Sequence, residues 1–98
     1  MTDHQINNNV KPSTVFALMY EFGSAHIPVT AVAKKYFGYD ENTANRYARQ
    51  SKFPFPVFRL GGQGTQWMVD AVEFAAYLDK VKEKAKKQFK EAKLEVGK

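Results

Sequence analysis

The chain has 98 residues, of which 44% are hydrophobic, enough for one small domain with an apolar core. It contains no Cys, which excludes a disulfide framework and a thiolate metal site. The polar start MTDHQINNNVKPS has no apolar signal segment, and no apolar run approaches the roughly 20 residues that span a membrane. We therefore expect an intracellular, cytoplasmic protein with no membrane partner.

The formal net charge of +5 is unevenly distributed. Residues 80–98 contain eight Lys and three Glu, whereas residues 1–79 contain seven basic and seven acidic residues. Within the neutral part, residues 30–69 hold six basic and two acidic residues, and no acid follows Glu41 there. A basic surface on a neutral body indicates a directed contact with a polyanion.

The N-terminal part predicts a tail followed by a helix. Residues 1–12 are polar and aperiodic, and we expect them to form a flexible tail. Ser13 or Thr14 can cap a first helix that runs to about Phe22, where Gly23 stops it.

Two short helices separated by a tight turn are predicted next. An extended stretch at 26–29 leads to a helix over 31–37, which Thr30 can cap. Asp40 can cap the following helix over 41–50. The break of about three residues between them is typical of a helix-turn-helix.

A hairpin follows, because Pro54 and Pro56 forbid a helix there. Strands are predicted over 57–60 and 66–69. The glycine-rich segment 61–65 between them suits a turn with positive φ.

A long basic helix ends the chain. Asp70 can cap it, it runs to about Lys93, and its apolar spacing fades after Val81. We expect a fold that is mainly α with a small β-hairpin, of the winged helix-turn-helix type. The winged domain would occupy 13–85, followed by a basic C-terminal helix extension at 86–98.

The helix over 41–50 has two unlike faces. Ala44, Tyr47 and Ala48 fill one face, which is suited to packing on the core. The other face consists of Asn42, Asn45, Arg46 and Arg49. A merely solvated face would favour Glu and Lys, because Asn is a poor helix former. Asn and Arg pair with adenine and guanine edges, so we expect this face to enter the major groove of double-stranded DNA.

Further contacts are expected from the residues around this helix and from the hairpin, whose tip has no acid. The candidate DNA-binding residues are Lys34, Lys35, Asn42, Thr43, Asn45, Arg46, Arg49, Lys52, Arg59, Gln63, Thr65 and Gln66. We expect Trp67 and the Phe residues at 53, 55 and 58 to belong to the core rather than to a base-stacking platform, which makes RNA a weaker candidate partner.

Catalytic and metal sites are not predicted. His4 and His26 are isolated from carboxylates at ligand spacing. The sequence contains no phosphate-binding loop, nucleophile elbow or clear carboxylate pair. We therefore expect a protein that is not an enzyme and has neither cofactor nor metal.

Self-association is expected, because one winged helix gives a small DNA interface and tight specific binding then needs two copies or an array. Phe16 and Tyr20 form a second apolar edge on the first helix. This edge and the apolar edge of the last helix are the candidate surfaces for a homo-oligomer.

Four segments resemble the pyocin activator protein family, the PrtN-like bacterial and prophage regulators. They are TVFALMYEFG at 14–23, IPVTAVAKKYFG at 27–38, FPFPVFRLGGQG at 53–64 and WMVDAVEFAAYLDK at 67–80. The resemblance covers residues 14–85. It implies a bacterial or phage-encoded, nucleoid-associated protein that binds specific DNA sequences and activates bacteriocin or phage-derived genes.

Two alternatives stay open at the level of the sequence. The same architecture is similar to phage excisionases and to MerR-type domains, so a recombination directionality factor that bends attachment-site DNA is one alternative. A protein-interaction module, such as an antirepressor or an adaptor for RNA polymerase, is the other. RNA polymerase is also a candidate partner of an activator.

Overall fold

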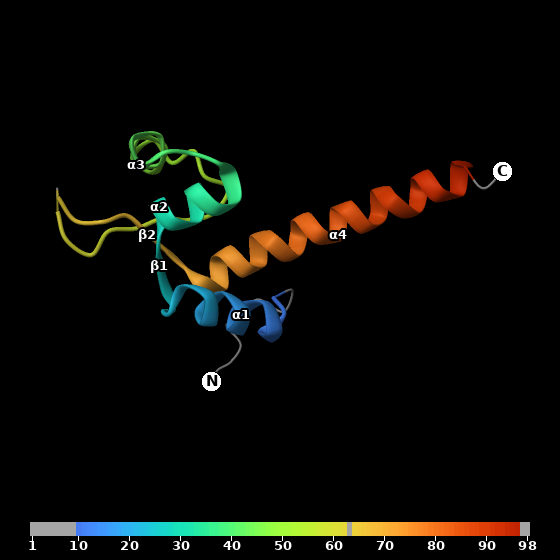
Figure 1. Cartoon of the computed structure of the whole chain (residues 1–98), viewed down its shortest axis with the longest axis horizontal. Coiled ribbons are helices and arrows are strands. Elements are labelled where there is room, and N and C mark those ends of the chain that lie inside the picture. Colours follow the sequence, from blue (N-terminus) through green and yellow to red (C-terminus); the bar gives the residue numbers. More distant parts are fainter. Residues whose placement is uncertain (1–9, 63, 97–98) are drawn as a thin grey trace.

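The computed structural model describes residues 10–62 and 64–96, which form four α-helices and a two-stranded antiparallel sheet (Figure 1). The elements are α1 (Pro12–Phe22), β1 (His26–Pro28), α2 (Val29–Val32), the π-helical turn η1 (Ala33–Phe37), α3 (Glu41–Arg49), β2 (Met68–Asp70) and α4 (Ala71–Val96). The prediction of a mainly helical fold is confirmed. The predicted flexible tail lies outside the described residues except at positions 10–12.

The N-terminus of α1 is capped by another helix rather than by its own sequence. The predicted cap at Ser13 or Thr14 is wrong, because α1 begins at Pro12 and has no local side-chain cap. Asp79 of α4, only 6% exposed, takes that place and accepts hydrogen bonds from Lys11 N and Thr14 Oγ1, each at 2.9 Å. The sequence could not show this contact, since its partners are 65 and 68 positions apart.

The second helix begins earlier than predicted. It starts at Val29 instead of Ala31, so the predicted cap at Thr30 is wrong. The reason lies in the sheet: Val29 follows β1 directly, and its N–H donates to the carbonyl of Trp67 at 2.9 Å. This backbone hydrogen bond satisfies the Val29 N–H, so the start of the helix does not depend on a side-chain cap at Thr30.

The helix continues as the π-helical turn η1, which was predicted as ordinary α-helix. Tyr36 and Phe37 are adjacent in this turn, yet both contact aromatic rings of the core. The ring of Tyr36 lies 5.2 Å from that of Phe74, and the ring of Phe37 lies 5.8 Å from that of Phe53. Tyr36 nevertheless stays 38% exposed, so its side chain lies at the edge of the core.

The predicted hairpin strands are too long. Only Phe58 and Met68 pair across the hairpin, through Phe58 N to Met68 O at 2.9 Å and Met68 N to Phe58 O at 2.8 Å. On its other side β2 pairs with β1, with Ile27 opposite Val69 and Pro28 opposite Met68. The described residues between Phe58 and Met68, 59–62 and 64–67, are called the glycine loop below and extend away from the helices (Figure 1). Its glycines disfavour a longer ladder.

An aromatic core joins η1, the proline-flanked segment and α4. Phe53 and Phe55 are 8% and 7% exposed, and Phe74 of α4 is fully buried. The prediction that Phe53 and Phe55 belong to the core is confirmed, and Pro54 and Pro56 flank them in the exposed chain. The same prediction is wrong for Phe58, which is half-buried outside this cluster and packs edge-on against the ring of His26, with centroids 5.8 Å apart.

The last helix begins at Ala71, directly after Asp70, and runs to Val96, beyond the predicted end near Lys93. Its first half packs on α1 and the core, and its second half projects away from them (Figure 1). The described side chains from Lys80 to Leu94 are all exposed, in agreement with the loss of apolar spacing after Val81.

The Asp79 contact generates a stability prediction. Asp79→Ala leaves the Lys11 N–H and the Thr14 hydroxyl without their acceptor, and we expect the free energy of unfolding to fall by about 1–3 kcal/mol at pH 7. Ser13→Ala is the matched control: its side chain is exposed, and we expect a change within about 0.5 kcal/mol. Urea unfolding followed by circular dichroism measures both, and equal stabilities of the two variants would contradict the assigned role.

The same contact predicts a pH dependence. Burial raises the pKa of Asp79, but hydrogen bonds from Lys11 and Thr14 outweigh it and hold the pKa below the ordinary value of 3.8. The folded state therefore binds the proton less readily than the unfolded state. The contribution of Asp79 is fully present above pH 3.8 and is lost as the pH falls through the lowered pKa. Urea titrations at pH 7 and pH 2.5 should show the Asp79→Ala defect shrinking at the lower pH.

Candidate nucleic-acid interface

A tight turn and a cap fix the start of α3. Gly38 ends the preceding turn in the left-handed region at φ 72°, where glycine carries no Cβ penalty. The predicted cap is confirmed: Asp40 Oδ1 accepts a hydrogen bond from Thr43 N at 2.8 Å. Hydrogen bonds from the Thr43 backbone and side chain hold the pKa of Asp40 below its ordinary value. The helix ends at Arg49, one residue before the predicted end at Gln50.

The two faces of α3 are arranged as the spacing predicted. Ala44 and Ala48 are 0% and 1% exposed and pack on the core. Asn42, Arg46 and Arg49 are exposed, and Asn45 is half-buried. The buried alanines therefore direct the polar face outward.

A groove of about 490 Å³ separates α3 from the glycine loop. Its lining residues are Thr30, Glu41, Asn45, Arg49, Arg59, Gly64, Thr65, Gln66 and Trp67. Five of the predicted contact residues thus meet here, two from α3 and three from the loop. Two guanidinium groups and several amide and hydroxyl groups can donate hydrogen bonds to an anionic, base-bearing ligand.

A second hollow, of about 710 Å³, adjoins the groove near the start of α3. It shares Thr30, Glu41 and Gln66 with the groove and adds Lys34, whose side chain is exposed. Lys34, one of the candidate DNA-binding residues, is therefore placed beside the groove.

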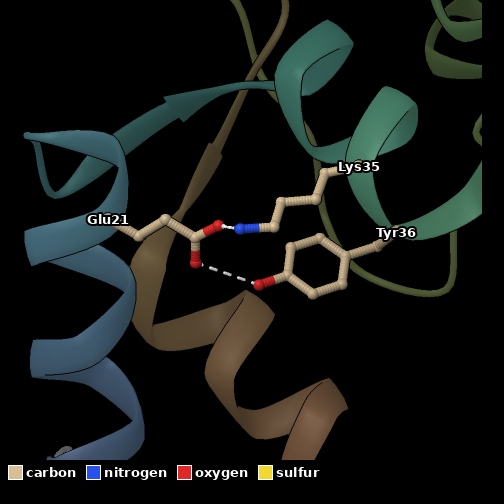
Figure 2. A network of polar contacts seen from close by, with 3 residues as sticks. All are labelled: Glu21, Lys35 and Tyr36. Atoms are coloured by element: carbon tan, nitrogen blue, oxygen red, sulfur yellow. Dashed lines mark hydrogen bonds and ion pairs between the residues drawn. The ribbon is translucent and has the colours of Figure 1, made fainter.

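Lys35 does not belong to this surface. Its ammonium group forms an ion pair with Glu21 of α1, and Tyr36 donates a hydrogen bond to the same carboxylate at 3.1 Å (Figure 2). The ammonium group also lies 5.7 Å from the centroid of the Tyr36 ring. Adjacent residues on a helix point in different directions, so the sequence pair Lys34–Lys35 is divided between two surfaces.

The remaining predicted residues of α3, and Lys52 after its end, lie outside the groove lining. The cationic groups of Arg46 and Lys52 lie over the Tyr47 ring, each 5.4 Å from its centroid. Asn42 is exposed and Thr43 half-buried on the same helix. The last predicted contact residue, Gln63, lies outside the described residues.

Sequence reasoning missed four residues that line the groove: Thr30, Glu41, Gly64 and Trp67. Thr30 was assigned to a helix cap, and Glu41 and Gly64 were not among the predicted contact residues. Trp67 was assigned to the core; it is half-buried against the core, but it also lines the groove. The guanidinium of Arg59 lies 4.5 Å from its ring centroid. The sequence did contain a signal for this pair. In a short hairpin, residues 59 and 67 are opposite each other on the two arms, next to the Phe58–Met68 pair.

Residues 10–62 and 64–96 contain neither a metal-ligating cluster nor a membrane-spanning helix. No three His, Cys, Asp or Glu side chains lie together there as metal ligands would. Across the same residues, none of the helices combines the length and apolarity needed to cross a membrane.

Residues 14–85 match the family model described as pyocin activator protein PrtN. The match includes the elements from α2 to α3, the glycine loop and the first half of α4. No curated protein and no solved structure matches the chain significantly.

The contact between Arg59 and Trp67 generates an optical prediction. Arg59→Ala removes the guanidinium from the ring of the only Trp in the chain. We expect the fluorescence emission of Trp67 to shift to longer wavelength, because its ring becomes more exposed to water. Arg46→Ala is the control, since Arg46 lies over Tyr47 instead, and should leave the emission maximum unchanged. Identical spectra for wild type and Arg59→Ala would show that the contact does not form in solution.

Proposed function

Because the chain belongs to the pyocin activator protein PrtN family, we propose that it is a sequence-specific DNA-binding protein that activates transcription of bacteriocin or prophage-derived genes. The observation that carries this proposal is the groove between α3 and the glycine loop, where Asn45, Arg49 and Arg59 meet. A family of activators and a basic, amide-rich groove beside an exposed helix support the same function.

In this proposal the fold acts as a winged helix-turn-helix. The segment from α2 to η1 is the first helix, α3 is the recognition helix, and the glycine loop is the wing. The Asn and Arg side chains of α3 enter the major groove and contact base edges. Arg59, Thr65 and Gln66 contact the adjacent backbone or minor groove.

The phosphate contacts are assigned by the positions of the cations. Lys34 lies beside the groove and Arg46 is exposed on α3, whereas Lys35 is paired with Glu21. We therefore remove Lys35 from the proposed contacts. Five cations remain: Lys34, Arg46, Arg49, Lys52 and Arg59.

A homo-oligomer on DNA, with RNA polymerase as a further partner, completes the proposal. Phe16 and Tyr20 lie four residues apart on α1 and are 66% and 92% exposed. Packing these aromatic side chains against a second copy of the chain would remove them from water. The resulting dimer would also have twice the DNA interface of one copy. Sedimentation with and without DNA tests this, and strict monomers on isolated sites would contradict it.

Genomic-fragment selection with the purified protein, followed by footprinting, tests the function itself. Footprints upstream of promoters would support the activator. Footprints at a phage attachment site would identify an excisionase instead. Lack of enrichment over random DNA would favour a protein-interaction module and would contradict the proposal.

The proposed phosphate contacts predict how the DNA affinity depends on salt concentration. Neutralising about five phosphates should make log affinity fall with log salt at a slope near −4.5. Fluorescence anisotropy of a labelled site between 50 and 300 mM KCl measures the slope. An affinity that does not change with salt would contradict phosphate binding by these cations.

A second prediction compares two cations of the same charge. Arg49→Ala removes a guanidinium from the groove and should cost about 1–3 kcal/mol for the selected site if Arg49 pairs with guanine. Lys35→Ala removes the same charge from the α1 side and should change the affinity less than twofold. Anisotropy with the selected site and with an unrelated duplex separates lost specificity from lost charge. An equal loss for the two variants would contradict the assignment of α3.

A further inference from the structure

Glu41 is the acidic residue among those that line the groove between α3 and the glycine loop. It lies in the first turn of α3, its side chain is exposed, and it borders the adjoining hollow as well. Among the described residues it forms neither an ion pair nor a side-chain hydrogen bond, in contrast to Glu21. Its carboxylate is therefore available to a ligand in the groove.

A carboxylate in this position opposes DNA affinity. Phosphates approaching Arg49 and Arg59 would be repelled by it, and a groove built for charge alone would omit it. A carboxylate can nevertheless accept a hydrogen bond from the N4 amino group of cytosine, an edge that adenine and guanine contacts do not use. Its negative charge is thus unfavourable for general DNA binding and favourable for one base.

The geometry of α3 places Glu41 in line with the other base-contacting candidates. Glu41, Asn45 and Arg49 are spaced by four residues and all line the groove. On a helix such side chains lie above one another, about 6 Å apart along the axis. This row can meet successive positions of one DNA site.

We propose that Glu41 is a specificity-determining residue that selects cytosine at one position of the DNA site. This inference rests on the proposed DNA-binding function. It assigns discrimination to a residue that weakens general binding, and it names the base class that the groove recognises.

Complementing the positive end of the helix dipole is the other role open to an acid in this position. The two roles give opposite results. Loss of a dipole contact would lower stability and weaken binding to every sequence. Loss of a cytosine contact would leave stability nearly unchanged, reduce discrimination, and strengthen binding to unrelated DNA by removing a repulsive charge.

Selection from a randomised duplex library tests the proposal with wild type, Glu41→Gln and the control Glu73→Gln. Glu73 is also an exposed acid in the first turn of a helix, α4, but it does not line the groove. We expect wild type and Glu73→Gln to select the same site, with cytosine preferred at one position. Glu41→Gln should lose about tenfold of that preference and bind an unrelated duplex more tightly at low salt.

An unchanged cytosine preference in Glu41→Gln would overturn the inference, as would weaker binding to selected and unrelated DNA alike. Either result leaves the proposed function intact, because wild type would still have selected a defined site. Failure of wild type to select any site would instead overturn the proposed function, and this inference with it.

Discussion

The packing of one aromatic ring, that of Phe55, anchors the chain that connects the two sides of the groove. Its centroid lies 5.4 Å from that of Phe53, 5.2 Å from Phe74 and 5.7 Å from Tyr77. These contacts tie the segment after α3 to the first half of α4. That segment follows α3 and leads into the glycine loop, so its aromatic contacts connect the chain on both sides of the groove to α4 through the core.

Two prolines make this arrangement possible. Pro54 and Pro56 flank Phe55 and prevent the chain from continuing as helix after α3. The chain must therefore turn back across the core before it reaches Phe58, where it joins the sheet. The short β1–β2 sheet then connects the chain to the start of α4, where Ala71 N donates a hydrogen bond to Ala25 O at 2.8 Å. A few backbone hydrogen bonds and one aromatic cluster thus locate a surface that is lined mainly by polar side chains.

The sequence predicted what depends on local chemistry. The two faces of α3, the Asp40 cap and the end of the preceding helix at residue 37 all follow from residues within one or two turns, and the structure has them where expected. The positions of the helices followed for the same reason, since periodic burial is a local pattern.

The sequence failed where a partner distant along the chain replaces a local one. Asp79 accepts a hydrogen bond from Lys11 N at the start of α1, and the Trp67 carbonyl accepts one from Val29 N at the start of α2. The locally plausible Ser or Thr caps are therefore not used. Lys35 illustrates the same limit for the site: its charge suggested phosphate, but Glu21 from another helix binds it. The groove itself was invisible, because it arises between two segments whose approach depends on the core.

The exposed half of α4 has a geometric consequence for any molecule joined to it. The helix has 26 residues, so at about 1.5 Å per residue it is roughly 39 Å long. Only its first half is held by the core, and the remainder is a rod directed away from α3 and the glycine loop (Figure 1). A fluorophore or a fused domain at the C-terminal end is therefore held about 20 Å clear of the core. A label attached there would report the orientation of the domain without an added spacer, because the helix has a fixed direction relative to the core.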